Sequence, residues 1–415
     1  MTMPDPTPMT LDRADSRVRH DDSLMGAVRA FIARMRTGDL GILPVAIGLV
    51  VITVVFTALN PVFVAPANLV NLLFDCATVG FIALGVVCVL MLGEIDLAIG
   101  SMSGLASAIV GVLWIQAGLP IGIAIVAAIA MGAVMGLVYA LLLVHLGMPS
   151  FVSTLAGLLA LLGMQLYILG STGSINLPYA SGFVHFGQLM VMPAWVAYIL
   201  ALVPGGAMLW TKLRTARRRR EAGLAAGSLT LLAIRVVVTT VALVAAVWYL
   251  NLGRGVPWMF GLFVAAVVAL DYALKRTKWG RSMFAIGGNR EAARRAGINI
   301  NRITISAFML CSSLAAVGGV LGAARLASAS RQAGTGDVNL NAIAAAVIGG
   351  TSLFGGRGSA WSALLGILVI QAISNGLTLL NLSSSLRYMI TGAVLAIAVI
   401  VDSLARASRQ THGRG

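Results

Sequence analysis

The chain has 415 residues, of which 59% are hydrophobic and only 10% are charged, and its mean hydropathy is +0.95. Soluble domains are about half apolar and about a quarter charged, so this composition excludes an ordinary soluble fold and indicates a protein built for lipid. The formal charge of +15 raises the alternative of a nucleic-acid partner, but the same excess arises when basic residues mark the cytoplasmic loops of a membrane protein.

Residues 1–39 are polar, with three early prolines and mixed charges, and they lack the short apolar core of a cleaved signal peptide. We therefore expect a cytoplasmic N-terminal tail. Twelve apolar runs follow, and since about 20 apolar residues cross a bilayer as a helix, each is a candidate span. The runs cover residues 40–59, 69–92, 97–117, 121–146, 151–170, 190–209, 229–250, 257–274, 303–324, 340–354, 359–380 and 386–401.

These runs predict an all-α polytopic membrane protein with about twelve transmembrane helices. The tenth run, 340–354, is short for a span and could instead be a re-entrant or broken element, which a membrane tolerates where protein buries it. A single transmembrane domain then covers residues 40–404, and residues 405–415 form a C-terminal tail.

The positions of the basic residues indicate how the chain is oriented in the membrane. If both termini are cytoplasmic, most of the 29 Lys and Arg residues lie in the tails and in two cytoplasmic loops, 211–228 and 275–302. This placement explains the positive charge without nucleic acid. Small residues at helical spacing, Gly132 with Gly136 and Gly318 with Gly322, predict close packing between helices.

The sequence shows no residue pattern typical of an enzyme. No lysine follows a glycine as a phosphate-binding P-loop requires, so any ATP must be hydrolysed by a partner. The four histidines are scattered, and the three cysteines lie in apolar runs without metal-ligand spacing. We therefore expect no catalytic residue, no metal site and no cofactor.

Acidic residues in apolar runs cost free energy in a membrane, so each one is a candidate functional residue. Asp271 precedes Lys275 by four positions, which favours a helix-end ion pair. Glu94 and Asp96 differ, because they interrupt a long apolar stretch just before Gly100. Asp96 either caps the helix that restarts there or takes part in gating, and both readings stay open.

The loop 275–302 contains a short amphipathic helix by its pattern, with Asn289 at the N-cap and Gly297 at the end. As a bare pattern it is either a docking element or a basic helix on anionic lipid.

Several segments together resemble one family. The sequence GRSMFAIGGNREAARRAGIN in the second loop looks like the loop through which permeases of bacterial ATP-driven importers contact their ATPase, in the form found in the ribose and xylose branch. EIDLAIGSMSGL from Glu94 and VIGGTSLFGGRGS from Val347 agree with that branch. The basic stretch 212–220, with its flanking spans, is similar to an extra helix pair of xylose-type permeases. The family often shows Glu-Leu-Asp where this chain has Asn339-Leu340-Asn341.

The resemblance implies a sugar permease subunit in the bacterial inner membrane that works as a pair of copies. Its implied partners are a cytoplasmic ATPase subunit with two nucleotide domains and a periplasmic sugar-binding protein. The implied ATPase-coupling residues are Gly287, Gly288, Asn289, Glu291, Ala292, Ala293, Arg294 and Gly297.

Polar residues in or near the spans are candidates for the sugar path or its gate, because neutral sugars need hydroxyl-matching groups. The candidates are Glu94, Asp96, Ser153, Thr154, Gln165, Asn176, Asn375 and Thr391. The rival interpretation is a gradient-driven secondary transporter or facilitator, which usually carries ionisable groups near the bilayer midplane.

Overall fold

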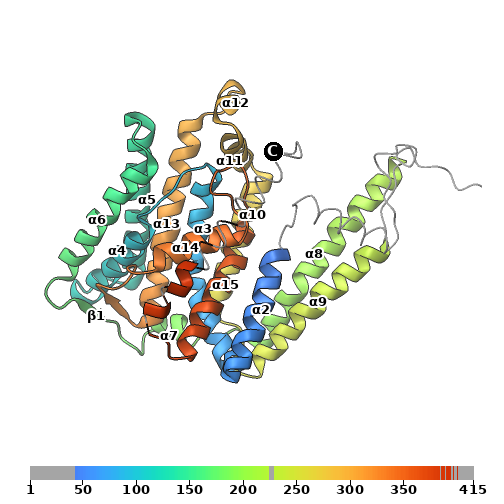
Figure 1. Ribbon diagram of the computed structural model, residues 1–415, viewed down its shortest axis with the longest axis horizontal. Helices are drawn as coiled ribbons and strands as arrows, with labels where there is room; N and C mark the ends of the chain where they lie inside the picture. The colour runs from blue at the N-terminus through green and yellow to red at the C-terminus, as the bar shows by residue number, and fades with distance from the viewer. Residues whose placement is uncertain are drawn as a thin grey trace, which may run out of the picture. The chain divides into compact units, whose positions relative to one another are not determined.

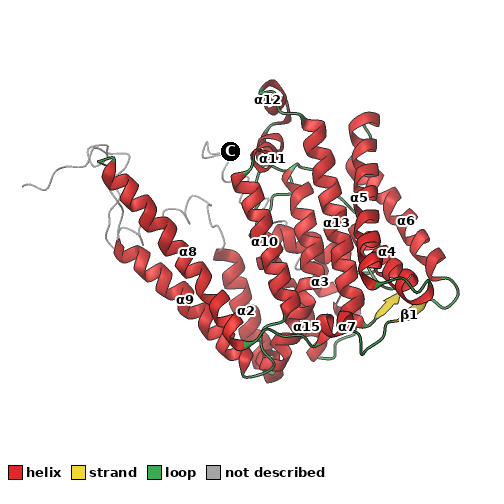
Figure 2. Ribbon diagram, turned by 180° about the vertical axis from the view of Figure 1, so that it is seen from behind, coloured by secondary structure: helices red, strands yellow, loops and turns green. Residues whose placement is uncertain are grey.

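The computed structural model describes residues 43–223 and 229–383, and nearer the C-terminus residues 385–387, 389–393, 396 and 400. Helix dominates this part of the chain, as Figure 2 shows. The helices are α2 (Leu43–Leu59), α3 (Pro66–Met91), α4 (Ile99–Gly111), α5 (Ile121–Leu146), α6 (Ser150–Leu169), α7 (Gly182–Gln188), α8 (Ala194–Glu221), α9 (Leu229–Asn251), α10 (Trp258–Arg276), α11 (Lys278–Gly288), α12 (Arg290–Arg295), α13 (Ile300–Leu326), α14 (Val338–Ile348) and α15 (Ala360–Leu379).

Short elements complete the described chain. A 3₁₀ turn covers Pro61–Val64, and a π-helical segment over Val112–Gln116 continues α4. Strands β1 (Ser174–Asn176) and β2 (Ser328–Ser330) pair antiparallel, with Ile175 opposite Ala329. The sequence patterns predicted neither strand, because three residues carry no usable alternation.

Nine helices of the described chain are long and apolar enough to cross a membrane. The chain is therefore a multi-pass, mostly helical protein, and the count of twelve stays a prediction. The predicted run 386–401 is described only in part, and both predicted tails lie outside the described residues. The run 340–354 corresponds to α14 and the start of a non-helical connection over 349–359. At about 1.5 Å per residue, α14 alone is too short to span.

The described chain forms two compact units, and the smaller one contains α8 and α9. These helices pack against each other, and Gly205 faces the Thr240 hydroxyl with no room for a side chain between them. Helix α8 continues to Glu221, so the first part of the predicted loop 211–228 is helical.

The larger unit is built around α13, which packs against α3, α4 and α5 (Figure 1). Helix α4 is buried along nearly all of its length. A methyl group on Gly132 of α5 would lie 2.6 Å from the Ser312 carbonyl oxygen of α13, and one on Gly136 would overlap the Phe308 carbonyl. The predicted close packing is confirmed there.

Gly318 of α13 packs in the same way, since a methyl group on it would lie 2.7 Å from the Thr78 carbonyl oxygen of α3. The prediction was wrong for Gly322, because a methyl group there would meet no atom of the described residues within 4 Å. Figure 1 places α11 and α12 at one end of the larger unit and α7 and β1 at the opposite end.

Candidate transport site

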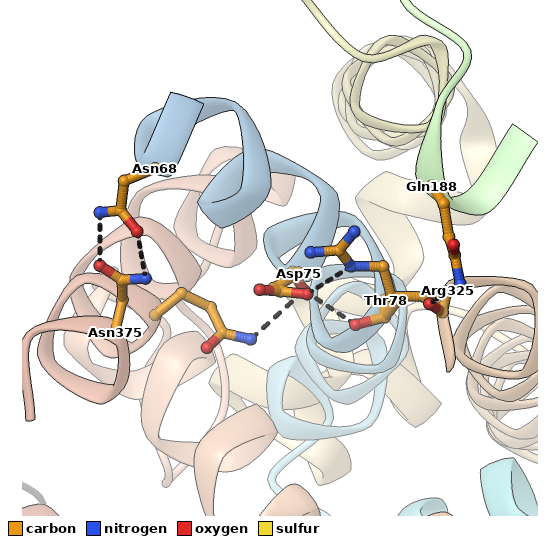
Figure 3. A network of polar contacts seen from close by, with 7 residues as sticks. Asn68, Asp75, Thr78, Gln188, Arg325 and Asn375 are labelled. Atoms are coloured by element: carbon orange, nitrogen blue, oxygen red, sulfur yellow. Dashed lines mark hydrogen bonds and ion pairs between the residues drawn. The ribbon is translucent and has the colours of Figure 1, made fainter. Parts of the chain in front are cut away.

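A polar stripe runs along α15 and faces polar residues on α3. Gln371, Ser374, Asn375 and Thr378 share one face of α15, because their spacing of three and four residues matches the helical repeat. The Asn375 amide and the Asn68 amide of α3 exchange two hydrogen bonds, of 2.8 and 3.0 Å (Figure 3). This reciprocal pair joins the two helices through polar groups rather than through apolar packing.

Asp75 lies two turns further along α3 and pairs with Arg325 in the last turn of α13. The Arg325 Nε atom lies 2.8 Å from Asp75 Oδ1, and its guanidinium group lies 5.2 Å from the centre of the Phe74 ring. The Arg325 side chain is 19% exposed, whereas the Asp75 side chain is 43% exposed. Arginine thus holds the carboxylate in place while leaving much of it accessible.

Backbone groups near the ion pair are also engaged. The Asp75 carbonyl accepts from the Thr78 hydroxyl at 2.8 Å and from the Gln371 amide at 3.3 Å. The Gln188 amide of α7 donates to the Arg325 carbonyl at 2.9 Å (Figure 3). Helix α7 lies at the end of the larger unit opposite α11 and α12, so the Arg325 end of this network is directed away from the basic loop.

These residues surround a partly open hollow of about 140 Å³. Its lining residues are Leu72, Asp75, Gln371, Ser374, Asn375 and Thr378. One carboxylate, two amides and two hydroxyls offer both donors and acceptors, which is the combination that a polyhydroxylated neutral molecule requires. Of the eight predicted path residues, only Asn375 lines this hollow.

Glu94 and Asp96 lie in the connection 92–98 between α3 and α4. Asp96 is buried, its Oδ1 atom accepts from the Ala98 N–H at 2.8 Å, and its Oδ2 atom lies 3.8 Å from Cys311 Sγ. The carboxylate therefore holds the backbone one residue before α4 begins. Glu94 instead forms an ion pair with Arg290, in which Arg290 Nη1 lies 3.0 Å from Glu94 Oε1.

Helix α6 fixes the same connection from the other side. The Thr154 hydroxyl accepts from the Leu97 N–H at 3.1 Å, and the Ser150 hydroxyl accepts from the Ile95 N–H at 3.3 Å. Ser153 donates to the Ser150 carbonyl of its own helix. In this conformation Ser153 and Thr154 are buried packing groups.

Gln165 and Asn339 hold the segment between β2 and α14. The buried Gln165 amide nitrogen donates to the carbonyls of Ser330 and Ala333, at 2.9 and 3.0 Å. The Asn339 side chain accepts from the Gly100 N–H. The first turns of α4 and α14 therefore meet, and Asn339 forms the contact.

The remaining path candidates lie elsewhere. Asn176 is exposed in β1, opposite Ser328, and Thr391 is half-buried in the described stretch 389–393. The structure does not bring either residue to the hollow.

The predicted helix of the second loop is confirmed as α12. The Asn289 side chain accepts from the Ala292 N–H at 2.9 Å, Ala293 is buried, and Gly297 has the left-handed φ of +80° that suits glycine. Glu291 pairs with Arg294 at 2.8 Å and with Arg295 at 3.3 Å. Glu291, Ala292 and Arg294 are exposed, so α12 offers a surface to a partner.

Three parts of the site escaped the sequence reasoning. Gln371, Arg325 and Asp75 are not among the residues that the sequence predicts for the path. The spacing of Asn68, Asp75 and the four polar residues of α15 within apolar runs is a signal that could have revealed the stripe. Arg325 could not have been assigned, because its partner lies 250 residues away.

Comparison with known proteins gives the class. The model of the family described as branched-chain amino acid transport system / permease component matches residues 68–399, and the chain belongs to this family. It is a membrane transport component rather than an enzyme.

Individual proteins with similar sequences narrow the class further. The chain is 33% identical over 341 residues to the xylose transport system permease protein XylH of Escherichia coli K12, covering 82% of this chain and 86% of that protein. It is 31% identical over 378 residues to XylH of Haemophilus influenzae, covering 89% and 98%. It is also 31% identical over 365 residues to the ribose import permease protein RbsC of Escherichia coli K12, covering 86% and 92%. No solved structure matches the chain.

Proposed function

We propose that the chain is the permease subunit of an ATP-driven importer for a monosaccharide in the bacterial inner membrane, and that its substrate is xylose. The names and extended coverage of the XylH relatives support the substrate, and the RbsC relative supports the wider class of small sugars. The permease provides the path and changes no covalent bond.

The polar stripe is the observation that carries this proposal. A half-exposed carboxylate and a row of amides and hydroxyls on membrane helices are costly against lipid, so they need water, protein or a polar solute beside them. The hollow of about 140 Å³ between α3 and α15 supplies such a place. Asp75, Gln371 and Asn375 would accept and donate hydrogen bonds to sugar hydroxyls there.

Under this proposal, the ATPase acts on the end of the larger unit that carries α11 and α12, opposite α7 (Figure 1). Helix α12, with its exposed Glu291 and Arg294, is the contact for a cytoplasmic ATPase subunit that carries two nucleotide domains. A periplasmic binding protein delivers the sugar to the other face, and a second permease copy completes the path. ATP binding and release then bias an equilibrium between outward-open and inward-open conformations through the different affinity of the ATPase for each.

The test is uptake in proteoliposomes that contain the permease with its ATPase and sugar-binding protein. We expect accumulation of labelled xylose that requires internal ATP and is not abolished by collapsing ion gradients. A panel of pentoses and hexoses as competitors assigns the substrate, and preference for ribose over xylose would contradict that part of the proposal. Uptake that follows an ion gradient without the ATPase would favour a secondary transporter.

A further inference from the structure

Glu94 connects the second loop to the interior of the permease. Its partner Arg290 is the first residue of α12 and lies 196 positions away in the sequence. The Glu94 side chain is only 14% exposed, whereas Arg290 is 49% exposed. Among the described residues, Glu291 forms its ion pairs with two exposed arginines of α12, Arg294 and Arg295. Arg290 is therefore the charged group of α12 that contacts the connection 92–98.

A backbone contact beside this ion pair joins three segments. The Gly356 N–H donates to the Met91 carbonyl at 3.0 Å, which links the connection 349–359 to the end of α3. Gly287, near the end of α11, lies between them, since a methyl group there would overlap both the Met91 carbonyl oxygen and the Gly356 nitrogen. We call Met91, Gly287 and Gly356 the glycine junction.

The two contacts lead to two helices, α4 and α14, that contact each other. The connection 92–98 ends at α4, and the connection 349–359 begins at the end of α14. The first turns of α4 and α14 meet where Asn339 accepts from the Gly100 N–H. Packed interiors change between discrete arrangements rather than by gradual deformation. A displacement of α11 and α12 must therefore move both connections with it or break the ion pair and the junction.

We infer that Glu94, Arg290 and Gly287 transmit the position of α11 and α12 to the start of α4, so that Glu94 is a positioning residue for energy coupling rather than a lining residue of the sugar path. The inference rests on the proposed function. The ion pair supplies an attractive link that acts when α12 is displaced in either direction. The junction supplies a steric link, because its backbones touch without intervening side chains.

Charge reversal tests the ion pair in the reconstituted complex of permease, ATPase and binding protein. Glu94→Arg and Arg290→Glu are each expected to lower the sugar taken up per ATP hydrolysed by about fivefold or more, the lower range of measured couplings between sites. The double variant, in which the charges are exchanged, is expected to recover most of this loss. Arg217→Glu is the matched control, because Arg217 forms an exposed pair with Glu221 elsewhere in the chain.

Gly287→Ala tests the junction and is expected to uncouple uptake from hydrolysis in the same way. Gly122→Ala in α5 is its control, since a methyl group there meets no atom of the described part of the chain within 4 Å. Normal uptake per ATP in both charge-reversal variants would overturn the inference. So would a double variant as impaired as the single variants while all of them keep the parental melting temperature.

A labelling measurement separates this inference from the proposed function. A cysteine at Ile95 should change its reactivity when the ATPase is trapped with nucleotide, and Arg290→Glu should remove that change. If the parent complex takes up no sugar with ATP, the proposed function fails. If the reactivity at residue 95 does not depend on nucleotide, or keeps that dependence in Arg290→Glu, the inference fails.

Discussion

Substitutions in the amide pair between Asn68 of α3 and Asn375 of α15 can distinguish a structural role of the pair from a role in transport. Asn375→Leu removes two neutral hydrogen bonds, of 2.8 and 3.0 Å, between helices. A net value of about 1 kcal/mol for each such bond in proteins, and about 0.6 kcal/mol between membrane helices, predicts a loss of about 1–2 kcal/mol. The Asn68 amide left behind is only half-buried and still donates to the Phe63 carbonyl, which keeps the loss in this range.

The matched variant Asn68→Leu loses the same two bonds and a third, because Asn68 also donates to the Phe63 carbonyl at 2.8 Å. The double leucine variant leaves no unpaired amide at the contact. Its loss of stability should therefore be smaller than the sum of the single losses by about 1 kcal/mol or more.

Thermal unfolding and xylose uptake, measured on the same four preparations, provide the assay. If the pair lines the sugar path, uptake stays low in the double variant even though that variant loses no more stability than Asn68→Leu alone, because leucine offers no group to a hydroxyl. Parental uptake in a stable double variant would refute the reasoning, since the amides would then serve only to join α3 and α15.

Other substitutions test single elements. Gln165→Leu should lower stability by about 1–2 kcal/mol, because it removes two hydrogen bonds to the half-buried Ser330 and Ala333; an unchanged melting temperature would contradict this. Asp96→Asn retains an acceptor for the Ala98 N–H and should leave the melting temperature unchanged while impairing uptake, whereas Asp96→Ala should also destabilise by about 1 kcal/mol; parental uptake by the asparagine variant would leave Asp96 only a structural role. A cysteine in place of Glu221 should resist a membrane-impermeant thiol reagent in intact cells and react after permeabilisation, and the three native cysteines are buried; labelling of intact cells would contradict the cytoplasmic placement.

Elements defined by local chemistry were predictable from the sequence. The bounds of α5 match the predicted run 121–146, because Pro120 precedes its first turn and Gly147 ends it with a φ of +66°. The cap of α12 at Asn289 was predictable for the same reason. Each of these features depends on residues within a few positions of one another.

Features that depend on distant residues were not predictable. The pairing of β1 with β2 joins residues about 150 positions apart, and the short strands have no pattern of their own. Glu94 was expected with the path or gate, and only the fold shows that its partner is Arg290. The pairing of Asp75 with Arg325 was not predictable for the same reason. The spacing of the polar residues on α15, in contrast, can be read from the sequence.

ATP-dependent uptake of xylose by the reconstituted complex tests the central claim most directly. Proteoliposomes loaded with ATP, and supplied with the binding protein and labelled xylose outside, should accumulate the sugar above its external concentration. Replacing Asp75 by alanine in the hollow should abolish most of that accumulation. Accumulation that needs no ATP, or that proceeds at the parental rate without the Asp75 carboxylate, would contradict the account.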